Sequence, residues 1–413
     1  MKEIKREKYL NELIAARENK LIKVITGIRR SGKSYLLEPI FKNYLLDSGV
    51  KEDHIIKLDL DLIENKKYRK PMELFNYVMD KIKDKEIYYI LLDEIQLVDN
   101  FEDVLNSFLK KTNLDVYVTG SNSKFLSNDI ITEFRGRSTE IKVYPLSFNE
   151  FVELKNKPLD VSWKEYVLYG GLPPVVLQDN EKQKREYLSS LFETTYLKDI
   201  IERNDVKRKD VLDSVVNILA SSVGSLTNPL NIYKTFTSTG NKDISINTII
   251  SYIEYIENAF LIKKVERYDV KGRKYISTPF KYYFTDLGLR NVRLNFRQQE
   301  ENHLMENIIF NELLIRGYNV DVGVVEVRNS SSRTYYEIDF VCNMASNRYY
   351  IQSALNIDSL EKNYQESRPL NCVGDNFKKI IVVKDDINSW HNDDGILIIG
   401  IKDFLLDKNS LNL

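Results

Sequence analysis

The sequence predicts an α/β protein whose first domain is built on a parallel β-sheet, and three neighbouring segments carry this prediction. Residues 21–26 form a short, apolar, β-branched run that is typical of a buried parallel strand. A loop containing two glycines follows at once, and residues 35–46 then place apolar side chains at helical spacing. Strand, loop and helix in this order form the repeating unit of a parallel α/β sheet.

The loop between this strand and this helix matches the phosphate-binding pattern GxxxxGK[ST]. Backbone N–H groups at the start of a helix hold an anion, and the glycines permit a tight turn close to the phosphates. We expect Lys33 to contact the β- and γ-phosphates and Ser34 to offer its hydroxyl to Mg²⁺. A chance match is the alternative, which the strand and helix on either side disfavour. The residues predicted to bind nucleotide are Gly27, Ile28, Arg29, Arg30, Ser31, Gly32, Lys33, Ser34 and Tyr35.

A second apolar strand, residues 87–92, ends in the adjacent acids Asp93 and Glu94, about sixty residues after the phosphate loop. We expect Asp93 to hold Mg²⁺, directly or through water, and Glu94 to orient and deprotonate the attacking water. Paired acids are also common at helix N-termini, so the combination with the phosphate loop is what predicts a Walker B segment. No Asn-Lys-x-Asp motif for guanine occurs, and ATP is therefore the predicted nucleotide.

Polar residues also follow the next predicted strand, residues 114–119. Neighbouring parallel strands end at one edge of the sheet, so Asn122 or Ser121 is predicted to contact the γ-phosphate or the attacking water, as a sensor. An ordinary turn is the alternative. Farther on, Arg135 or Arg137 is predicted to reach the γ-phosphate of a neighbouring subunit, which implies a homo-oligomer. A surface salt bridge is the alternative for these arginines.

Composition limits the remaining possibilities. A chain of 413 residues is too long for a single hydrophobic core, so we expect several domains. Because the net charge is −1, any basic surface must be confined to one part of the protein. Two cysteines, Cys342 and Cys372, cannot build a disulfide framework and indicate a reducing, cytoplasmic compartment. The first residues contain no apolar signal segment and no run is long enough to span a bilayer, so we expect no membrane association. Three histidines without metal-ligand spacing make a zinc site improbable.

The middle of the chain is predicted to hold a helical lid and then a winged helix-turn-helix. Residues 151–205 are helical, with a rigid break at 170–174. Residues 201–300 hold 16 Lys and Arg against 11 Asp and Glu, unlike the chain as a whole. The predicted winged helix, residues 206–295, consists of two helices and two basic strands: 229–236, 244–256, 261–268 and 274–284.

This winged helix predicts either duplex-DNA binding or a protein contact. The second helix, with Ser245 as its N-cap, offers Asn247, Thr248, Ser251 and Glu254 but neither lysine nor arginine. Phosphate affinity needs cations, which disfavours DNA at this helix. The basic residues 263–274 of the strands favour DNA over an exclusively protein partner.

The last part of the chain, residues 296–413, is predicted to be an αβ domain with the order of a metal-dependent nuclease core. Glu306 lies on a predicted helix, and Glu337 and Asp339 lie on a predicted strand. Such cores need a further carboxylate and a lysine near Mg²⁺, whereas this chain has Gln352-Ser353-Ala354 at that place. We therefore expect an inactive domain that binds a partner without cutting it. The alternative is that Glu337 and Asp339 pair with Arg328 or Arg333.

With these residues in place, the chain resembles the archaeal and bacterial AAA+-type ATPases that carry a C-terminal domain of unknown function. The resemblance spans the full length and is most specific at the two arginines of the phosphate loop, at LDEIQ and at PLSFNEF. Its motifs are GIRRSGKS (27–34), LLDEIQ (91–96), TGSNS (119–123), FRGR (134–137), YPLSFNEF (144–151), YGGLPP (169–174), LKDI (197–200), EIDFV (337–341) and YIQ (350–352).

The resemblance implies a P-loop ATPase core over 1–150, a lid over 151–205, a winged helix over 206–295 and a restriction-endonuclease-like PD-(D/E)xK domain over 296–413. Lys33, Ser34, Asp93, Glu94 and Asn122 keep their expected roles, and Arg137 becomes the favoured trans-acting arginine. Gln352 and Ser353 depart from active nucleases. The predicted function is an ATPase that switches or moves a DNA-associated assembly, with ATP and Mg²⁺ as cofactors. The alternatives are an ATP-regulated nuclease and an ATP-dependent scaffold for protein contacts.

Overall fold

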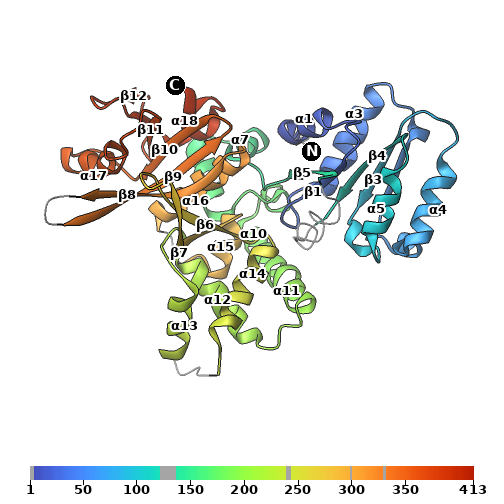
Figure 1. Cartoon of the computed structure of the whole chain (residues 1–413), viewed down its shortest axis with the longest axis horizontal. Coiled ribbons are helices and arrows are strands. Elements are labelled where there is room, and N and C mark those ends of the chain that lie inside the picture. Colours follow the sequence, from blue (N-terminus) through green and yellow to red (C-terminus); the bar gives the residue numbers. More distant parts are fainter. Residues whose placement is uncertain (1–3, 121–135, 239–242, 298–299, 329–331) are drawn as a thin grey trace. The chain divides into compact units, whose positions relative to one another are not determined.

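The computed structural model describes residues 4–120, 136–238, 243–297, 300–328 and 332–413 (Figure 1). They form two compact units. Unit 1 comprises Met1–Pro145 with Asn258–Phe260, and unit 2 comprises Leu146–Glu257 with Leu261–Leu413. Within the described residues, none of the helices combines the length and the apolar character that crossing a membrane demands.

Unit 1 contains a five-stranded sheet in which every pair of neighbours is parallel, in the order β2-β3-β4-β1-β5. The strands are β1 (Ile22–Thr26), β2 (Ile55–Asp59), β3 (Tyr88–Asp93), β4 (Leu114–Thr119) and β5 (Ser138–Lys142). Because β1 lies between β4 and β5, the phosphate loop that follows it lies at the carboxyl edge of the sheet. The predicted parallel α/β fold is therefore confirmed.

Helices cover both faces of this sheet because alternate strand residues are apolar on both sides (Figure 1). One face packs against α4 (Pro71–Lys81) and α5 (Phe101–Leu109). The other face packs against α1 (Glu7–Ala15) and the segment after the phosphate loop. That segment comprises α2 (Lys33–Tyr35), η1 (Leu36–Phe41) and α3 (Lys42–Asp47). Its helix is interrupted at Glu38 (φ −145°, ψ 123°), beside Pro39.

Unit 2 is organised around an eight-stranded mixed sheet in the order β12-β13-β11-β10-β9-β8-β6-β7. The strands are β6 (Ile262–Asp269), β7 (Lys274–Phe284), β8 (Asn319–Arg328), β9 (Arg333–Met344), β10 (Asn347–Ala354), β11 (Lys378–Val383), β12 (Trp390–His391) and β13 (Leu397–Gly400). The two strands of the predicted wing, β6 and β7, belong to this sheet, because β6 pairs in parallel with β8. The sheet thus continues across the predicted boundary at residue 295.

The α-helices of unit 2 begin with α7 and end with α18, after which the 3₁₀ helix η7 (Ser410–Asn412) follows. They are α7 (Phe148–Lys155), α8 (Leu159–Tyr169), α9 (Pro173–Val176), α10 (Glu181–Leu191), η6 (Phe192–Leu197), α11 (Lys198–Arg203), α12 (Lys209–Ser221), α13 (Pro229–Ser238), α14 (Ile246–Asn258), α15 (Leu287–Arg293), α16 (Glu301–Ile315), α17 (Leu360–Asn371) and α18 (Ile401–Leu406). The hydroxyl of Ser245 accepts a hydrogen bond from Thr248 N at 3.1 Å, so the predicted N-cap of α14 is present.

The Gly170–Gly171 break of unit 2 surrounds a buried carboxylate. Asp286 caps α15 by accepting from Leu289 N, and its other oxygen accepts from Gly171 N at 2.8 Å. Burial raises the pKa of Asp286 to about 6, against the opposite effect of these backbone donors. The hydrogen bond from Gly171 to Asp286 therefore joins the predicted lid to α15, which gives this break a structural role.

Candidate functional site

The phosphate loop is held in a shape that only glycine permits at its first position. Gly27 has φ 137°, and a Cβ atom built there would lie 2.1 Å from the carbonyl oxygen of Val143. Lys33 lies beneath the loop and donates to the carbonyl oxygens of Gly27 (2.9 Å) and Ile28 (3.1 Å). Burial lowers the pKa of Lys33 to about 8, although the Glu94 and Asp93 carboxylates act in the opposite direction. The ammonium thus lies in the loop, with the two acids near enough to influence it.

The other predicted nucleotide residues divide into buried and exposed groups. Ile28 and Ser31 are buried within the loop, and Arg29 is half-buried. Arg30 (φ 64°) and Tyr35 are exposed, so their side chains are accessible from solvent. Ile28 and Ser31 therefore help to shape the loop, whereas the side chains of Arg30 and Tyr35 are accessible to a ligand.

Asp93 lies beside the start of the helical segment, as the predicted magnesium site requires. Its carboxylate is buried and accepts hydrogen bonds from the hydroxyls of Ser34 and Thr119. Burial raises its pKa, and these two donors oppose that effect. Ser34 and Asp93 therefore bring a hydroxyl and a carboxylate oxygen together, and Mg²⁺ prefers such oxygen ligands.

Glu94 is fixed at both its backbone and its side chain. It has left-handed backbone angles (φ 54°, ψ 47°), which are uncommon for a residue other than glycine. Its N–H donates to Thr119 Oγ1 at 2.9 Å, and its carboxylate accepts from the amide of Gln96. Thr119 thus fixes the backbone of Glu94, and Gln96 orients the side chain that is predicted to activate water.

Two residues of this edge, Thr119 and Asp59, were not expected to contribute to the site. Thr119 is the last residue of β4, the strand next to β3, and it contacts both Asp93 and Glu94. Asp59 ends β2 directly opposite Asp93 in the register, and its charge helps to raise the Asp93 pKa. The common signal is a polar residue at the last position of a buried strand, whereas the site residues predicted from the sequence lie beyond the predicted strand ends.

Of the residues predicted as the sensor or as the trans-acting arginine, the structure describes Arg137. Ser121, Asn122 and Arg135 lie outside the described residues. Arg137 is exposed and precedes β5, and its carbonyl oxygen accepts from Ile22 N at the start of β1. It therefore lies at the amino edge of the sheet, whereas the phosphate loop lies at the carboxyl edge, about 16 Å away along the five residues of β1.

Unit 2 brings the acids of the predicted nuclease core together around an unexpected lysine. Lys281 of β7 is buried, and its ammonium lies 2.7 Å from Glu306, 2.8 Å from Glu337 and 3.7 Å from Asp339. Residues 353 and 354 are serine and alanine and carry no ammonium, but another strand supplies one. The alternative pairing with Arg328 or Arg333 is wrong, because both arginines pair with Glu326 instead.

The environment of this cluster shifts the pKa values of its members in different directions. Burial raises the pKa of Asp339 to about 8, with a further contribution from the negative charge of Glu306. The pKa of Glu306 is lowered: burial acts to raise it, but Lys281 and the donors His303 and Tyr283 outweigh that effect. The pKa of Lys281 is raised, since the three carboxylates outweigh its burial.

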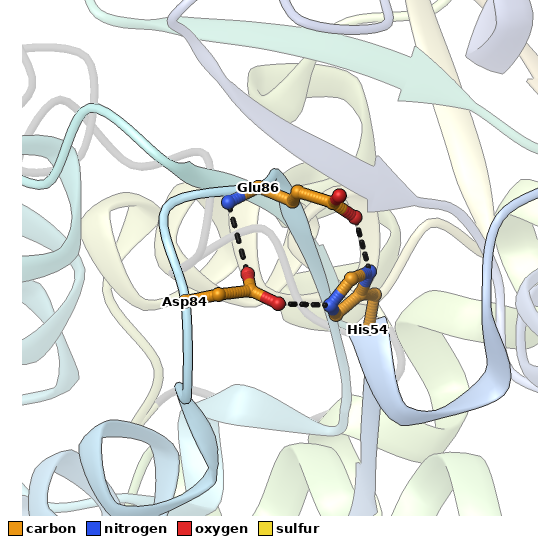
Figure 2. Close-up of side chains that lie close together, drawn as sticks. All are labelled: His54, Asp84 and Glu86. Atoms are coloured by element: carbon orange, nitrogen blue, oxygen red, sulfur yellow. Dashed lines mark hydrogen bonds and ion pairs between the residues drawn. The ribbon is translucent and has the colours of Figure 1, made fainter.

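A second group of titratable side chains in unit 1 comprises His54, Asp84 and Glu86 (Figure 2). It lies at the amino edge of the sheet, opposite the phosphate loop. His54 precedes β2, and Asp84 and Glu86 precede β3. Asp84 faces Nε2 of the imidazole at 3.1 Å, whereas Glu86 faces Nδ1 at 3.4 Å. A metal ion would bind one ring nitrogen from one side, so carboxylates on both nitrogens indicate a hydrogen-bonded histidine.

Comparison with known proteins gives matches over most of the chain. Residues 19–152 match the family model described as an AAA domain, and residues 160–300 match a domain of unknown function. An uncharacterized protein of Haemophilus influenzae is 37% identical over 409 residues, which cover 98% of each chain. An uncharacterized protein of Methanocaldococcus jannaschii is 29% identical over 361 residues, or 83% of this chain and 76% of the other.

Similar solved structures include two archaeal proteins. One is the Aeropyrum pernix ORC1 protein in complex with DNA, with 14% identity, a TM-score of 0.29 and coverage of 70% of this chain and 92% of that chain. The other is Cdc6p from Pyrobaculum aerophilum, with 10% identity, a TM-score of 0.30 and coverage of 74% and 94%. Neither likeness is close enough to bear on function.

Proposed function

The chain belongs to one family with the Haemophilus influenzae relative and carries an AAA domain, and we propose from this premise that it hydrolyses ATP to switch or move a DNA-associated assembly. The observation that carries the proposal is the arrangement at the carboxyl edge of the unit 1 sheet. There Lys33 lies within the phosphate loop, Ser34 bonds to Asp93, and Glu94 follows at once. This combination binds a phosphate chain and presents a base to water.

Each side chain of this edge has a distinct part in the proposed reaction. The amide groups of the loop and Lys33 hold the phosphates, and Lys33 exchanges its bonds to Gly27 and Ile28 for phosphate oxygens. The hydroxyl of Ser34 and the carboxylate of Asp93 would hold Mg²⁺, which supplies charge stabilisation at the phosphates when bound. Glu94 accepts a proton from the attacking water. Thr119 and Gln96 keep Glu94 in position.

An arginine from a neighbouring subunit completes the proposed site. Arg137 lies at the amino edge of its own sheet, too far from its own phosphate loop to contact a nucleotide there. An exposed guanidinium at this place is available to the phosphates of a second copy of the chain. The proposed active form is therefore a homo-oligomer. Asn122 or Ser121 remains the proposed sensor.

The proposed contact with DNA rests on two hairpins of unit 2. The turn between β6 and β7 presents Lys271, Arg273 and Lys274 to solvent, and Lys271 donates to the carbonyl oxygen of Glu326 on β8. The adjacent β8–β9 hairpin carries Arg328 and Arg333, both exposed and both paired with Glu326. Basic side chains thus outnumber acidic ones at this end of the sheet, and such a surface attracts the phosphate backbone of DNA.

The test of this proposal is ATP turnover by the full chain with and without duplex and single-stranded DNA across a salt series. The proposal expects hydrolysis that depends on Mg²⁺ and that changes with duplex DNA at low salt. Turnover that DNA does not affect would favour a scaffold for protein contacts, and cleavage of the DNA would favour the nuclease. A cytoplasmic location accords with ATP as substrate and stays part of the proposal.

A further inference from the structure

The strongest unexplained feature is the largely buried cluster of unit 2, in which one ammonium lies among three carboxylates, of which only Glu337 is partly exposed (33%). Its members come from three separate elements: β7 supplies Lys281, α16 supplies Glu306, and β9 supplies Glu337 and Asp339. Isolated buried charges are costly, so such a group persists only if its charges compensate one another. The cluster therefore needs a cation at its centre.

In a nuclease-like domain that cation would be a divalent metal ion, and with Lys281 in place these residues do not fit one. Mg²⁺ binds oxygen ligands at about 2.0–2.1 Å, which holds the ligand atoms within about 4.2 Å of one another. Within the residues that the structure describes, the oxygens of Glu306, Glu337 and Asp339 do not gather within 4.8 Å; only the His54 group does. With the ammonium between them, these oxygens stand farther apart than Mg²⁺ holds its ligands.

Two of the three acids also accept hydrogen bonds from groups other than Lys281. Asp339 Oδ2 accepts from Ser353 N at 2.8 Å, and Glu306 Oε1 accepts from the hydroxyl of Tyr283 as well as from Lys281. Gln352, at the place of a nuclease carboxylate, accepts from Asp339 N at 3.3 Å. A metal ion at the centre would displace the ammonium or lie beside it, at a large Coulombic cost.

We propose that the ammonium of Lys281 permanently takes the place of the divalent cation, so that the carboxylate cluster of unit 2 is complete without metal. Lys281 then joins β7, at one end of the sheet order, to α16 and β9. A consequence is that loss of the ammonium, and not addition of metal, opens a cation site in this domain.

The proposal is tested by titrating the full chain with Mn²⁺ in the absence of nucleotide. Thermal unfolding gives Tm at each Mn²⁺ concentration, and the concentration of free Mn²⁺ gives the amount bound. The Lys281→Met variant keeps a side chain of similar length and removes the charge. Its Tm should lie below that of wild type and rise by about 5–10 °C at a Mn²⁺ concentration about 100 times Kd. Wild type should show no Mn²⁺ binding that the Asp339→Asn substitution removes. The site at Ser34 and Asp93 is common to both proteins and cancels in the difference.

Two further variants separate the outcomes. Lys384→Met removes a lysine that pairs with Glu301 at 2.6 Å on the surface, and should leave the Mn²⁺ response of wild type unchanged. Asp339→Asn added to Lys281→Met should abolish the new response. A folded Lys281→Met protein without a Mn²⁺ response contradicts the proposal. If Lys281→Met does not fold, wild type still provides a test. Mn²⁺ binding by wild type that is lost in the Asp339→Asn variant would contradict the proposal.

Discussion

The backbone N–H of Glu94 donates a 2.9 Å hydrogen bond to the hydroxyl oxygen of Thr119, whose own proton goes to Asp93. One buried side chain at the end of β4 thereby fixes both acids of the neighbouring strand. The register accounts for this contact, since Leu92 lies opposite Val118 and the next residues on each strand are Asp93 and Thr119.

Replacement of Thr119 by valine should therefore impair turnover more than nucleotide binding. Valine has a similar shape but neither accepts from Glu94 nor donates to Asp93, and misplacement of a catalytic group by about 1 Å costs about 10²-fold in rate. We expect kcat to fall about 10²-fold with little change in KM. Thr26→Val is the matched control, because this threonine ends β1 but bonds to Glu140. Equal kcat for Thr119→Val and wild type would contradict the assigned role.

Arg137 should act on the nucleotide of a neighbour and not on its own. Arg137→Ala and Lys33→Ala should each be nearly inactive, and mixing the two should restore turnover at interfaces that combine an intact Lys33 with an intact Arg137. A mixture of Lys33→Ala and Glu94→Gln is the control, because both defects lie in a subunit's own site and no intact site can form. A protein that stays monomeric with ATP at full activity would contradict the trans role.

The hairpin cations should account for the salt dependence of DNA binding. Each phosphate contact adds about 0.9 to the slope of log K against log salt concentration. The triple variant Lys271→Ala, Arg273→Ala and Lys274→Ala should reduce that slope by about three for duplex DNA, across sequences alike. Lys182→Ala is the control, since this exposed lysine pairs with Glu186 on α10. An unchanged slope in the triple variant would exclude this surface.

The stability of unit 2 should fall as pH rises towards 8. The pKa of Asp339 is about 8 in the folded protein against an ordinary value of 3.8, so the folded state holds a proton that the unfolded state releases. This contribution is fully present below about pH 4 and is lost as pH rises to about 8, by at most about 1.4 kcal/mol per pH unit. Asp339→Asn should remove the slope in urea unfolding, whereas Asn at the exposed Asp393 should not. A slope that persists in Asp339→Asn would contradict the assignment.

The sequence predicts the fold of unit 1 well because its information is local. A β-branched strand, two glycines and an amphipathic helix follow one another within 26 residues of chain, from Leu21 to Leu46, and local order is what periodicity reports. The same holds for β3 with Asp93 and Glu94. By contrast, Thr119 enters the site through strand register, which depends on how distant segments pair.

The cluster of unit 2 shows the same limit more clearly. Glu306, Glu337 and Asp339 are predictable as a group because helix and strand order suggests their proximity. Lys281 precedes Glu306 by 25 residues and lies on a strand that the sequence assigns to a wing. Only the continuation of one sheet through β6 and β8 brings that strand to the acids. Long-range pairing of this kind leaves no periodic signal in a single sequence.

The measurement that tests the central proposal most directly compares wild type with Glu94→Gln in ATP binding and in phosphate release. Glutamine keeps the shape of Glu94 and its contact with Gln96 but cannot accept the proton of the attacking water. We predict that Glu94→Gln binds ATP with the wild-type Kd and loses about 10²–10⁴-fold in kcat, whereas Lys33→Ala loses binding itself. Phosphate release by Glu94→Gln at the wild-type rate would contradict the proposal that this edge of the sheet hydrolyses ATP.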